Sequence, residues 1–220
     1  MNHPSYCHIV VLISGSGSNL QALIDASTTA NFKISAVISN NQEAYGLQRA
    51  EKNNIPVQVI DHRSFETRED FDLILRKTID EINPNLIVLA GFMRILGSNF
   101  VNHFSGRILN IHPSLLPKYP GINSHQRALD GGEQEHGVTV HFVTEALDGG
   151  PIIAQMKVPV LEEDTPDILA ARVLNREHII YPKTVAWFGA GRLRMEGTRA
   201  ILDGEPLPPT GVQIKYEPIP

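Results

Sequence analysis

The sequence predicts an α/β fold with a parallel sheet that helices cover on both faces. In the first half of the chain, short β-branched runs alternate with segments of helical pattern. Strands that are joined by crossover helices run parallel, and a sheet of this kind is buried on both sides. The 220 residues, 42% of them hydrophobic, suffice to bury a full core, so we expect one domain that needs neither disulfides nor a metal to fold.

The elements of the first half follow in a regular order. Apolar runs predict strands at 8–14, 34–40, 56–61 and 86–92. Helical patterns follow the first three of these strands, at 19–27, 46–54 and about 66–82. Pro84 closes the third helix. A further strand lies within 106–113, before a loop with Pro and Gly that runs to about residue 123.

The second half has a different pattern. Two apolar runs, 136–144 and 151–160, are joined through EALDGG, a link too short for a crossover helix, so these strands should be antiparallel. The tail from residue 203 is rich in Pro and Gly and is expected to be poorly ordered or packed as an extended arm. The whole order predicts a single-domain Rossmann-like sheet, parallel in its N-terminal half, with antiparallel strands and a long helix in its C-terminal half.

That long helix spans 165–188. Thr165 is the expected N-cap and Pro166 the first helical residue, which are favoured positions for both residue types. Pro182 should kink or interrupt the helix, because proline lacks the N–H that an interior turn needs.

Composition excludes several classes of protein. The single cysteine, Cys7, cannot form an internal disulfide, and the N-terminus lacks a secretory pattern, which favours a reducing cytoplasm. No apolar run approaches the roughly 18 residues of a membrane span, so we expect a soluble protein with no membrane partner. A net charge of -5 gives no general attraction to nucleic acid. The sequence leaves open whether the chain is a monomer or a homodimer.

The stretch LISGSGSNL at 12–20 raises the question of a nucleotide. A dinucleotide site requires G-x-G-x-x-G, and here Gly15 and Gly17 fit while Leu20 takes the third glycine position. A single phosphate needs only a short turn and a helix N-terminus. The loop by itself leaves open a dinucleotide, a single phosphate or no ligand. The missing glycine favours a single phosphate, with Leu20 in the core and the backbone N–H groups of Gly17, Ser18 and Asn19 facing the anion.

Asn110 and His112 lie at the C-terminal end of a predicted parallel strand, where open α/β sheets place their sites. The two-residue period of a strand puts both side chains on one side. An amide and a protonated imidazole together can stabilise an oxyanion in acyl transfer. The alternative is that Asn110 caps the strand end and His112 is a half-buried turn residue.

Asp148 is the third candidate. It precedes two glycines in TEALDGGPI, and a carboxylate there could orient His112 and hold a water or an amine proton. Alone, Asp-Gly-Gly is more often a hairpin turn, so Asp148 gains weight only together with Asn110 and His112.

Other chemistries lack their residues. The chain has no G-x-x-x-x-G-K-[ST] loop for ATP and no G-x-S-x-G nucleophile elbow. Cys7 is expected before the first strand, away from the sheet edge that carries sites. The nine histidines show no H-E-x-x-H or similar spacing, so we expect no catalytic metal. What remains is metal-free, non-covalent transfer.

Several blocks of sequence carry a resemblance to a known family. They are SGSGSNLQA (14–22), LAGFMRIL (89–96), LNIHPSLLPKYPG (109–121), EHGVTVHFVTEALDGGPI (135–152) and EHIIYP (177–182). With them the chain resembles the phosphoribosylglycinamide formyltransferases (glycinamide ribonucleotide transformylases) of the 10-formyltetrahydrofolate transferase superfamily. The resemblance implies transfer of a formyl group from 10-formyltetrahydrofolate, as co-substrate, to the amine of 5'-phosphoribosylglycinamide in purine (IMP) synthesis.

The resemblance also assigns residues. Asn110, His112 and Asp148 match the catalytic trio, with His112 as proton donor. The ribonucleotide site matches Gly17, Ser18, Asn19 and Glu177. The formyl-folate site matches Arg68, Met93, Arg94, Ile95, Leu96, Asn110, Thr144, Glu145, Ala146, Leu147 and Asp148. One position departs from the pattern: some members have Lys or Gln three residues before the glutamate, where this chain has Leu174.

A flat, partly apolar pterin suits a slot of aliphatic side chains edged by backbone groups, which Met93, Ile95 and Leu96 could supply. Alternatively, these residues are core positions at the start of the next helix. Arg68 and Arg94 could meet the glutamate tail of the folate, although arginines at such places are usually solvated.

The resemblance implies that different segments of the chain have different functions. Residues 1–100 would form the phosphoribosyl-binding half, 101–200 the catalytic and folate-binding half, and 201–220 the tail. The alternatives are a methionyl-tRNA formyltransferase, which would need a C-terminal nucleic-acid-binding domain, and a formyltetrahydrofolate hydrolase, which usually carries an N-terminal regulatory domain. A catalytically silent nucleotide-binding module is a third alternative, against which the presence of all three catalytic residues argues.

Overall fold

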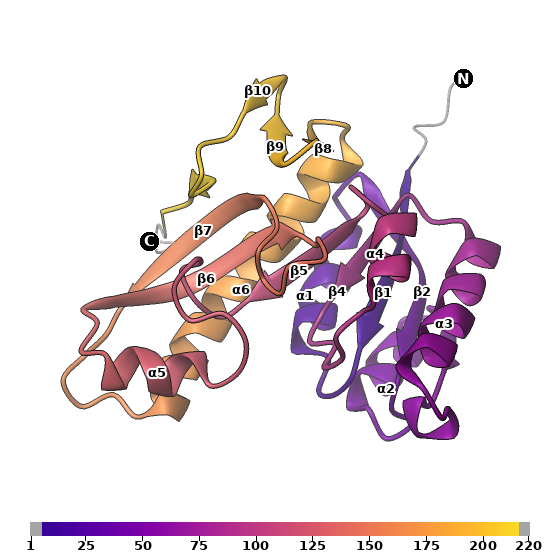
Figure 1. Ribbon diagram of the computed structural model, residues 1–220, viewed down its shortest axis with the longest axis horizontal. Helices are drawn as coiled ribbons and strands as arrows, with labels where there is room; N and C mark the ends of the chain where they lie inside the picture. Colours follow the sequence, from indigo (N-terminus) through magenta and orange to yellow (C-terminus); the bar gives the residue numbers. More distant parts are fainter. Residues whose placement is uncertain (1–5, 216–220) are drawn as a thin grey trace.

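A computed structural model describes residues 6–215 of the chain. Its main sheet has eight strands in the order β11-β7-β6-β5-β4-β1-β2-β3 (Figure 1). They are β1 (Cys7–Ile13), β2 (Phe32–Ser39), β3 (Val57–Val59), β4 (Leu86–Leu89), β5 (Ile108–His112), β6 (Glu135–Phe142), β7 (Ile152–Pro159) and β11 (Val212–Gln213). The first five strands run parallel and β6 is antiparallel to both β5 and β7, which confirms the predicted change between the two halves.

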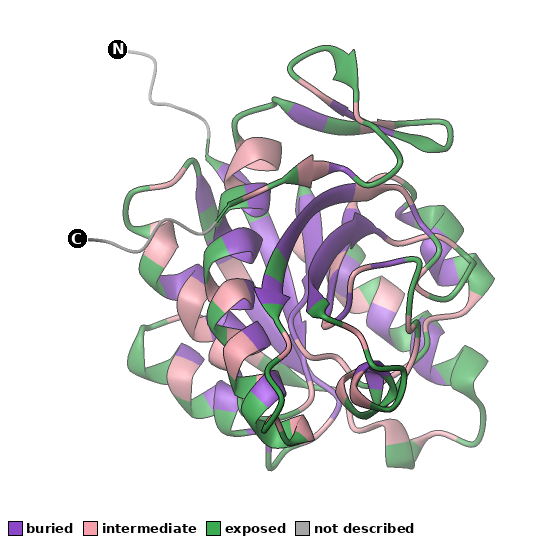
Figure 2. Cartoon of the chain, turned by 90° about the vertical axis from the view of Figure 1, so that its left-hand side faces the viewer, coloured by how far each residue is buried: buried purple, intermediate pink, exposed green. Residues whose placement is uncertain are grey.

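Helices cover both faces of this sheet. They are α1 (Ser18–Ser27), α2 (Tyr45–Lys52), α3 (Arg68–Ile82), α4 (Ser98–His103), α5 (Ser124–Asp130) and α6 (Pro166–Gly189), with a 3-10 turn at His62–Ser64. In β1, Ile9 and Val11 pack with α1, α2 and α6, whereas Val10 and Leu12 pack with α3 and α4. Figure 2 shows the result: strands of the main sheet are largely buried, and the helices are exposed on their outer sides.

The strand order determines where a site can form. From β1 the chain moves outward through β2 to β3, and it then returns to add β4 and β5 on the other side of β1. Connections therefore leave β1 and β4 in opposite directions, and open α/β sheets bind their ligands at the C-terminal ends of such a pair of strands. The loops after β1, β4 and β5 leave the sheet at this edge.

The long helix α6 begins as predicted but is not interrupted. The Thr165 side chain accepts from the N–H of Ile168, and Pro166 opens the helix. Pro182 lies inside an unbroken helix, so the expected interruption is wrong. The neighbouring Tyr181 is buried and donates its hydroxyl to the carbonyls of Leu89 (2.8 Å) and Leu109 (3.0 Å). Packing on the sheet therefore outweighs the one helical hydrogen bond that proline removes.

After α6, the chain forms a second, small sheet, which lies at the top of Figure 1. It consists of the antiparallel strands β8 (Leu193–Glu196), β9 (Arg199–Leu202) and β10 (Glu205–Pro206). The tail then returns to the main sheet, where β11 pairs in parallel with β7. Residues 203–215 are therefore the packed arm of the two expected alternatives, and 216–220 lie outside the described residues.

Cys7 is not placed as the sequence suggested. It is the first residue of β1, rather than a residue before it, and it is buried. Burial raises the pKa of its thiol to about 11, which keeps it protonated at neutral pH. Within residues 6–215, no helix is long and apolar enough to cross a membrane.

Candidate active site

Three predicted catalytic side chains meet at one edge of the sheet. Asn110 and His112 project from β5, and Asp148 comes from the loop after β6. His112 Nδ1 lies 3.4 Å from Asp148 Oδ2, and both side chains are more than nine-tenths buried. The structure thus brings together an amide, an imidazole and a carboxylate, the groups that the sequence singled out at positions almost 40 residues apart.

Backbone groups hold the His112–Asp148 pair. His112 Nε2 lies 2.9 Å from the carbonyl of Tyr119, and a carbonyl can only accept, so Nε2 carries a proton. The N–H of Gly121 donates to Asp148 Oδ2 at 2.8 Å. Nδ1 is consequently the imidazole nitrogen that faces the carboxylate.

His141 belongs to this site although sequence reasoning missed it. It stands directly opposite Asn110 in the β5–β6 pairing. Its Nδ1 lies 2.9 Å from the Phe142 carbonyl and therefore carries the proton, which leaves Nε2 to accept from Asn110 Nδ2 at 3.2 Å. Burial lowers the pKa of His141, in keeping with a neutral ring. The contact between Asn110 and His141 follows from the register of β6 against β5, which the sequence does not give. We call Asn110, His112, His141 and Asp148 the catalytic edge.

The loop at 14–19, here called the glycine loop, leads from β1 into α1. Gly17 has φ 69° and precedes the first turn of α1, whose N-terminal N–H groups receive no side-chain cap. Leu20 is fully buried, as predicted. Gly17 also packs against Gly46 at the start of α2, where a Cβ on Gly17 would lie 2.5 Å from the Gly46 Cα. The loop thus has the shape expected for holding an anion by backbone alone.

Asn19 and Glu177 come together from opposite ends of the chain. Asn19 Nδ2 donates to Glu177 Oε2 at 2.6 Å, and both residues are buried. Burial raises the pKa of the Glu177 carboxyl, while the Asn19 hydrogen bond partly opposes that rise. The two expected ribonucleotide contacts therefore form one polar unit between α1 and α6.

Arg49 and His178 are two further residues that sequence reasoning missed. Arg49 Nε donates to the carbonyl of Ser16 at 2.9 Å, which places a cation against the glycine loop. A cavity of about 480 Å3 lies beside it, between α1, α2 and α6, and both residues line it. Burial, and then the charge of Arg49, lower the pKa of His178. Arg49 thus brings a charged side chain to the glycine loop, from a helix other than the α6 that carries Leu174. Arg49 lies in α2, 32 residues after Gly17, and nothing in the sequence around it indicated that it would contact the glycine loop.

The loop after β4 divides the expected folate residues into two groups. Met93 and Ile95 are exposed by 77% and 60%, so they are not core residues. Leu96 packs against the core beneath α3, as the alternative interpretation held. The N–H of Met93 donates to Ser14 Oγ at 2.8 Å, which ties this loop to the glycine loop.

Arg68 and Arg94 lie near one buried carboxylate. Asp72 of α3 accepts from the N–H of Gly97 at 2.7 Å, and both arginines stabilise its charge. Burial nevertheless raises the pKa of Asp72. The Arg94 guanidinium also lies over the ring of Phe71, 5.3 Å from its centroid. Arg94 is therefore partly buried against α3, whereas Arg68, the first residue of α3, is exposed as the usual solvated alternative held.

The loop after β6 carries the remaining expected residues, Thr144–Asp148. Leu147 is exposed by 59%, and Glu145 accepts from Asn102 Nδ2 of α4 at 2.6 Å, so its side chain is directed at that helix. The N–H of Gly149 donates to the carbonyl of Ala146 at 3.0 Å and closes a turn that sets Asp148 at φ 49°. Thr144 and Ala146 lie in the same loop, next to β6.

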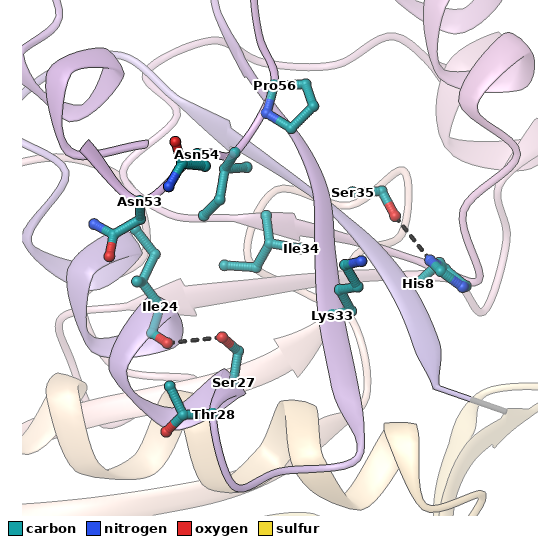
Figure 3. A pocket seen from close by; sticks show the side chains of 11 residues that line it. His8, Ile24, Ser27, Thr28, Lys33, Ile34, Ser35, Asn53, Asn54 and Pro56 are labelled. Carbon is teal, nitrogen blue, oxygen red and sulfur yellow. Dashed lines mark hydrogen bonds between the residues drawn. The ribbon is translucent and has the colours of Figure 1, made fainter. Parts of the chain in front are cut away.

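A second cavity, of about 590 Å3, lies at the opposite end of the sheet (Figure 3). The starts of β1 and β2 and the C-terminal ends of α1 and α2 form it, and none of the predicted site residues lines it. Several of its polar side chains already bond within the protein: His8 Nδ1 lies 3.0 Å from Ser35 Oγ, and Asn53 Nδ2 donates to the carbonyl of Arg49. Among residues 6–215, no group of three or more His, Cys, Asp or Glu residues is arranged to hold a metal ion.

Comparisons with known proteins agree with this geometry. Residues 7–185 match the formyl transferase family. The chain is 53% identical over 206 residues to phosphoribosylglycinamide formyltransferase of Escherichia coli (strain K12), which covers 93% of this chain and 97% of that protein. It is 44% identical over 200 residues to the trifunctional purine biosynthetic protein adenosine-3 of Homo sapiens, covering 88% of this chain and 20% of that protein. The structure of phosphoribosylglycinamide formyltransferase from Coxiella burnetii superposes with a TM-score of 0.91 at 54% identity, covering 94% of this chain and 99% of the other.

Proposed function

The chain belongs to the formyl transferase family, and from that premise we propose that it transfers the formyl group of 10-formyltetrahydrofolate to the amine of 5'-phosphoribosylglycinamide. The products are phosphoribosyl-N-formylglycinamide and tetrahydrofolate. The observation that supports this most strongly is the meeting of Asn110, His112 and Asp148 at the same edge of the sheet as the glycine loop. The reaction belongs to purine synthesis, and we place it in the cytoplasm.

The chemical step needs an oxyanion site and a path for a proton. The unprotonated amine attacks the formyl carbon, a C–N bond forms, and the carbonyl oxygen takes up the electron pair. Collapse of this tetrahedral oxyanion breaks the bond to N10. The amine nitrogen loses a proton and N10 gains one, so the reaction balances without an external oxidant or reductant.

Asn110 supplies the amide donor for the oxyanion. Its Nδ2 carries two N–H groups, and His141 accepts one of them, which leaves the other to donate. Because His141 is buried and held by the Phe142 carbonyl, the amide of Asn110 has a defined orientation before substrate arrives. A donor fixed in advance stabilises developing charge without reorganisation.

His112 and Asp148 handle the proton. The proton on His112 Nε2 is already donated to the carbonyl of Tyr119. Nδ1 is therefore the nitrogen that gives a proton to the oxyanion or to N10. Asp148 faces Nδ1 and stabilises the imidazolium. An α-amino group has a pKa of about 8 and is mostly protonated at neutral pH, so a water held by Asp148 is the natural acceptor of the amine proton.

The ribonucleotide occupies the side of the site next to β1. Its phosphate lies at the start of α1, against the backbone N–H groups of Gly17, Ser18 and Asn19, with Arg49 adding a positive charge. Glu177, paired with Asn19, accepts from the ribose hydroxyls. The amine of the substrate then reaches toward the catalytic edge.

The folate occupies the other side. Met93 and Ile95 offer exposed apolar surface for its flat ring system, with Arg94, Leu96 and the loop Thr144–Asp148 at its border. Arg68 and Arg94 attract the carboxylates of the glutamate tail. The proposed halves, 1–100 for phosphoribosyl binding and 101–200 for catalysis and folate, exchange residues in both directions. Glu177 of the second half completes the ribonucleotide site, and Arg68 and residues 93–96 of the first half belong to the folate site.

The test is a substrate-dependence assay. The purified protein, in EDTA and without ATP, should form tetrahydrofolate and formylated ribonucleotide in equal amounts only when both substrates are present. Release of tetrahydrofolate without the ribonucleotide would instead support a formyl-folate hydrolase. Thermal stabilisation by the ribonucleotide with no turnover would support a silent binding module.

A further inference from the structure

A three-residue stretch of backbone touches both members of the His112–Asp148 pair. The carbonyl of Tyr119 accepts from His112 Nε2, and two residues later the N–H of Gly121 donates to Asp148 Oδ2. The positions of the ring and of the carboxylate therefore both depend on where this stretch lies. A displacement of Tyr119 would free Nε2 and turn the imidazole.

The backbone of Tyr119 does not adopt this position by its own preference. Its φ is 56°, in the left-handed region that bulky residues rarely occupy. Such a conformation is strained and persists only when surrounding contacts enforce it. The contacts of the Tyr119 side chain are therefore part of what holds its carbonyl under His112.

Those contacts are specific. The Tyr119 hydroxyl donates to Glu133 Oε1 at 2.9 Å, and the guanidinium of Arg127 lies 5.3 Å from the ring centroid. Arg127 Nη1 also donates to the carbonyl of Pro120 at 2.6 Å. Side chains 8 and 14 residues away thus fix both the ring of Tyr119 and the backbone that follows it.

Gly131 makes room for this arrangement. A Cβ at Gly131 would lie 2.5 Å from the Tyr119 hydroxyl. The φ of Gly131 is -78°, which any residue can adopt, so glycine is not needed there for the backbone. The glycine is explained by the space that the hydroxyl takes.

We propose that Tyr119 is a positioning residue for the proposed formyl transfer, and that its hydroxyl, anchored on Glu133, holds the Tyr119 carbonyl against His112 Nε2. The inference rests on the proposed function. Tyr119 touches neither substrate in this role; it acts through the orientation of His112. Glu133 also forms an ion pair with the exposed Lys118 at 2.8 Å, and an exposed ion pair contributes little to the stability of the fold.

Four variants test the proposal, each measured for kcat and for both KM values. Tyr119→Phe, which keeps the ring but removes the hydroxyl, should lower kcat about tenfold while both KM values stay within about twofold, because a small misplacement of a catalytic group slows chemistry. Glu133→Ala should do the same. Glu133→Gln should retain most activity, because its amide oxygen still accepts from Tyr119. Lys118→Met should match the wild type.

The ratio of variant to wild-type kcat tests the positioning role, and wild-type turnover itself tests the proposed function, so the two can fail separately. A readout that needs no turnover is the exchange of the His112 Nε2–H proton with water, followed by NMR, which should be faster in Tyr119→Phe. Wild-type kcat and exchange in Tyr119→Phe would overturn the proposal. So would equal losses in Glu133→Gln and Glu133→Ala, or a comparable loss in Lys118→Met, since the hydroxyl would then not be the group that matters.

Discussion

The glycine loop and the catalytic edge lie at the same end of the sheet, but the first presents backbone groups and the second presents side chains. The glycine loop offers backbone N–H groups, and its shape depends on two glycines, Gly17 and Gly46, that approach each other without side chains. The catalytic edge offers side chains, and each is held by another group: Asn110 by His141, His112 by Tyr119 and Asp148 by Gly121.

This difference separates binding from chemistry. A backbone cradle can hold an anion but has no titratable group, so damage to it should raise a KM. Side chains that donate and move protons should determine kcat. The predictions below ask whether the two regions can be damaged independently, from the largest expected effect to the smallest.

The largest effect should come from the catalytic edge. Replacing Asn110 or His112 with Ala removes a donor to the oxyanion and should lower kcat by roughly a hundred- to a thousandfold. The KM for the ribonucleotide should stay within about twofold, because neither residue belongs to the glycine loop. Steady-state kinetics with each substrate varied will measure both constants. Wild-type kcat in His112→Ala would remove that residue from the mechanism.

The glycine loop should respond in the opposite way. Gly17→Ala places a Cβ 2.5 Å from the Gly46 Cα at a residue with φ 69°, so the loop must shift. We expect the KM for the ribonucleotide to rise roughly 10- to 100-fold while the KM for the folate changes little. Gly15→Ala is the matched control, since nothing lies within 4 Å of a Cβ there. Equal effects of the two substitutions would contradict the close-packing argument.

Arg49 gives a second test of whether damage near the glycine loop affects binding alone, because it adds a charged side chain to the backbone N–H groups of that loop. Arg49→Met should raise the KM for the ribonucleotide about tenfold, the value of one charge-assisted hydrogen bond, with little change in kcat. The effect should shrink for a substrate analogue without the phosphate. Lys52→Met, on the same helix, is the control and should bind like the wild type. A loss of kcat in Arg49→Met would place the arginine in the chemistry instead.

The smallest expected effect concerns stability in acid. Burial lowers the pKa of His136, on β6, to about 4. A histidine whose pKa is depressed by folding contributes stability that is complete above its unfolded value of 6.5 and is lost as the pH falls through about 4. The unfolding temperature should therefore fall by a few degrees between these pH values, and less so in His136→Phe. Identical pH profiles of the two proteins would show that His136 does not carry the effect.

Much of the fold could be predicted because its signals are local. The alternation of apolar and helical segments gave β1 to β5 with α1 to α3, and Thr165-Pro166 marked the start of α6. Helices α4 and α5 were missed, since they have 6 and 7 residues and begin without a side-chain cap. The small sheet was missed although Asp203-Gly204, both with positive φ, is a strong hairpin signal inside what looked like a tail.

For the candidate site, the sequence predicted several of the functional residues but not the groups that orient them. Two-residue spacing placed Asn110 and His112 on one face, whereas the single phosphate indicated by the missing third glycine stays a prediction. The partners that orient these groups were not predictable, because they depend on register and on tertiary packing: His141 on the pairing of β6 with β5, Tyr119 on a left-handed backbone, and Arg49 on the approach of α2 to α1.

The central claim is that the two regions carry separate functions within one formyl transferase site. The most direct measurement is the affinity of the His112→Ala variant for the ribonucleotide, by isothermal titration calorimetry, beside its kcat. The account predicts a dissociation constant within about twofold of the wild type and a kcat lower by at least about a hundredfold. A variant that loses affinity in proportion to its loss of kcat would contradict the separation.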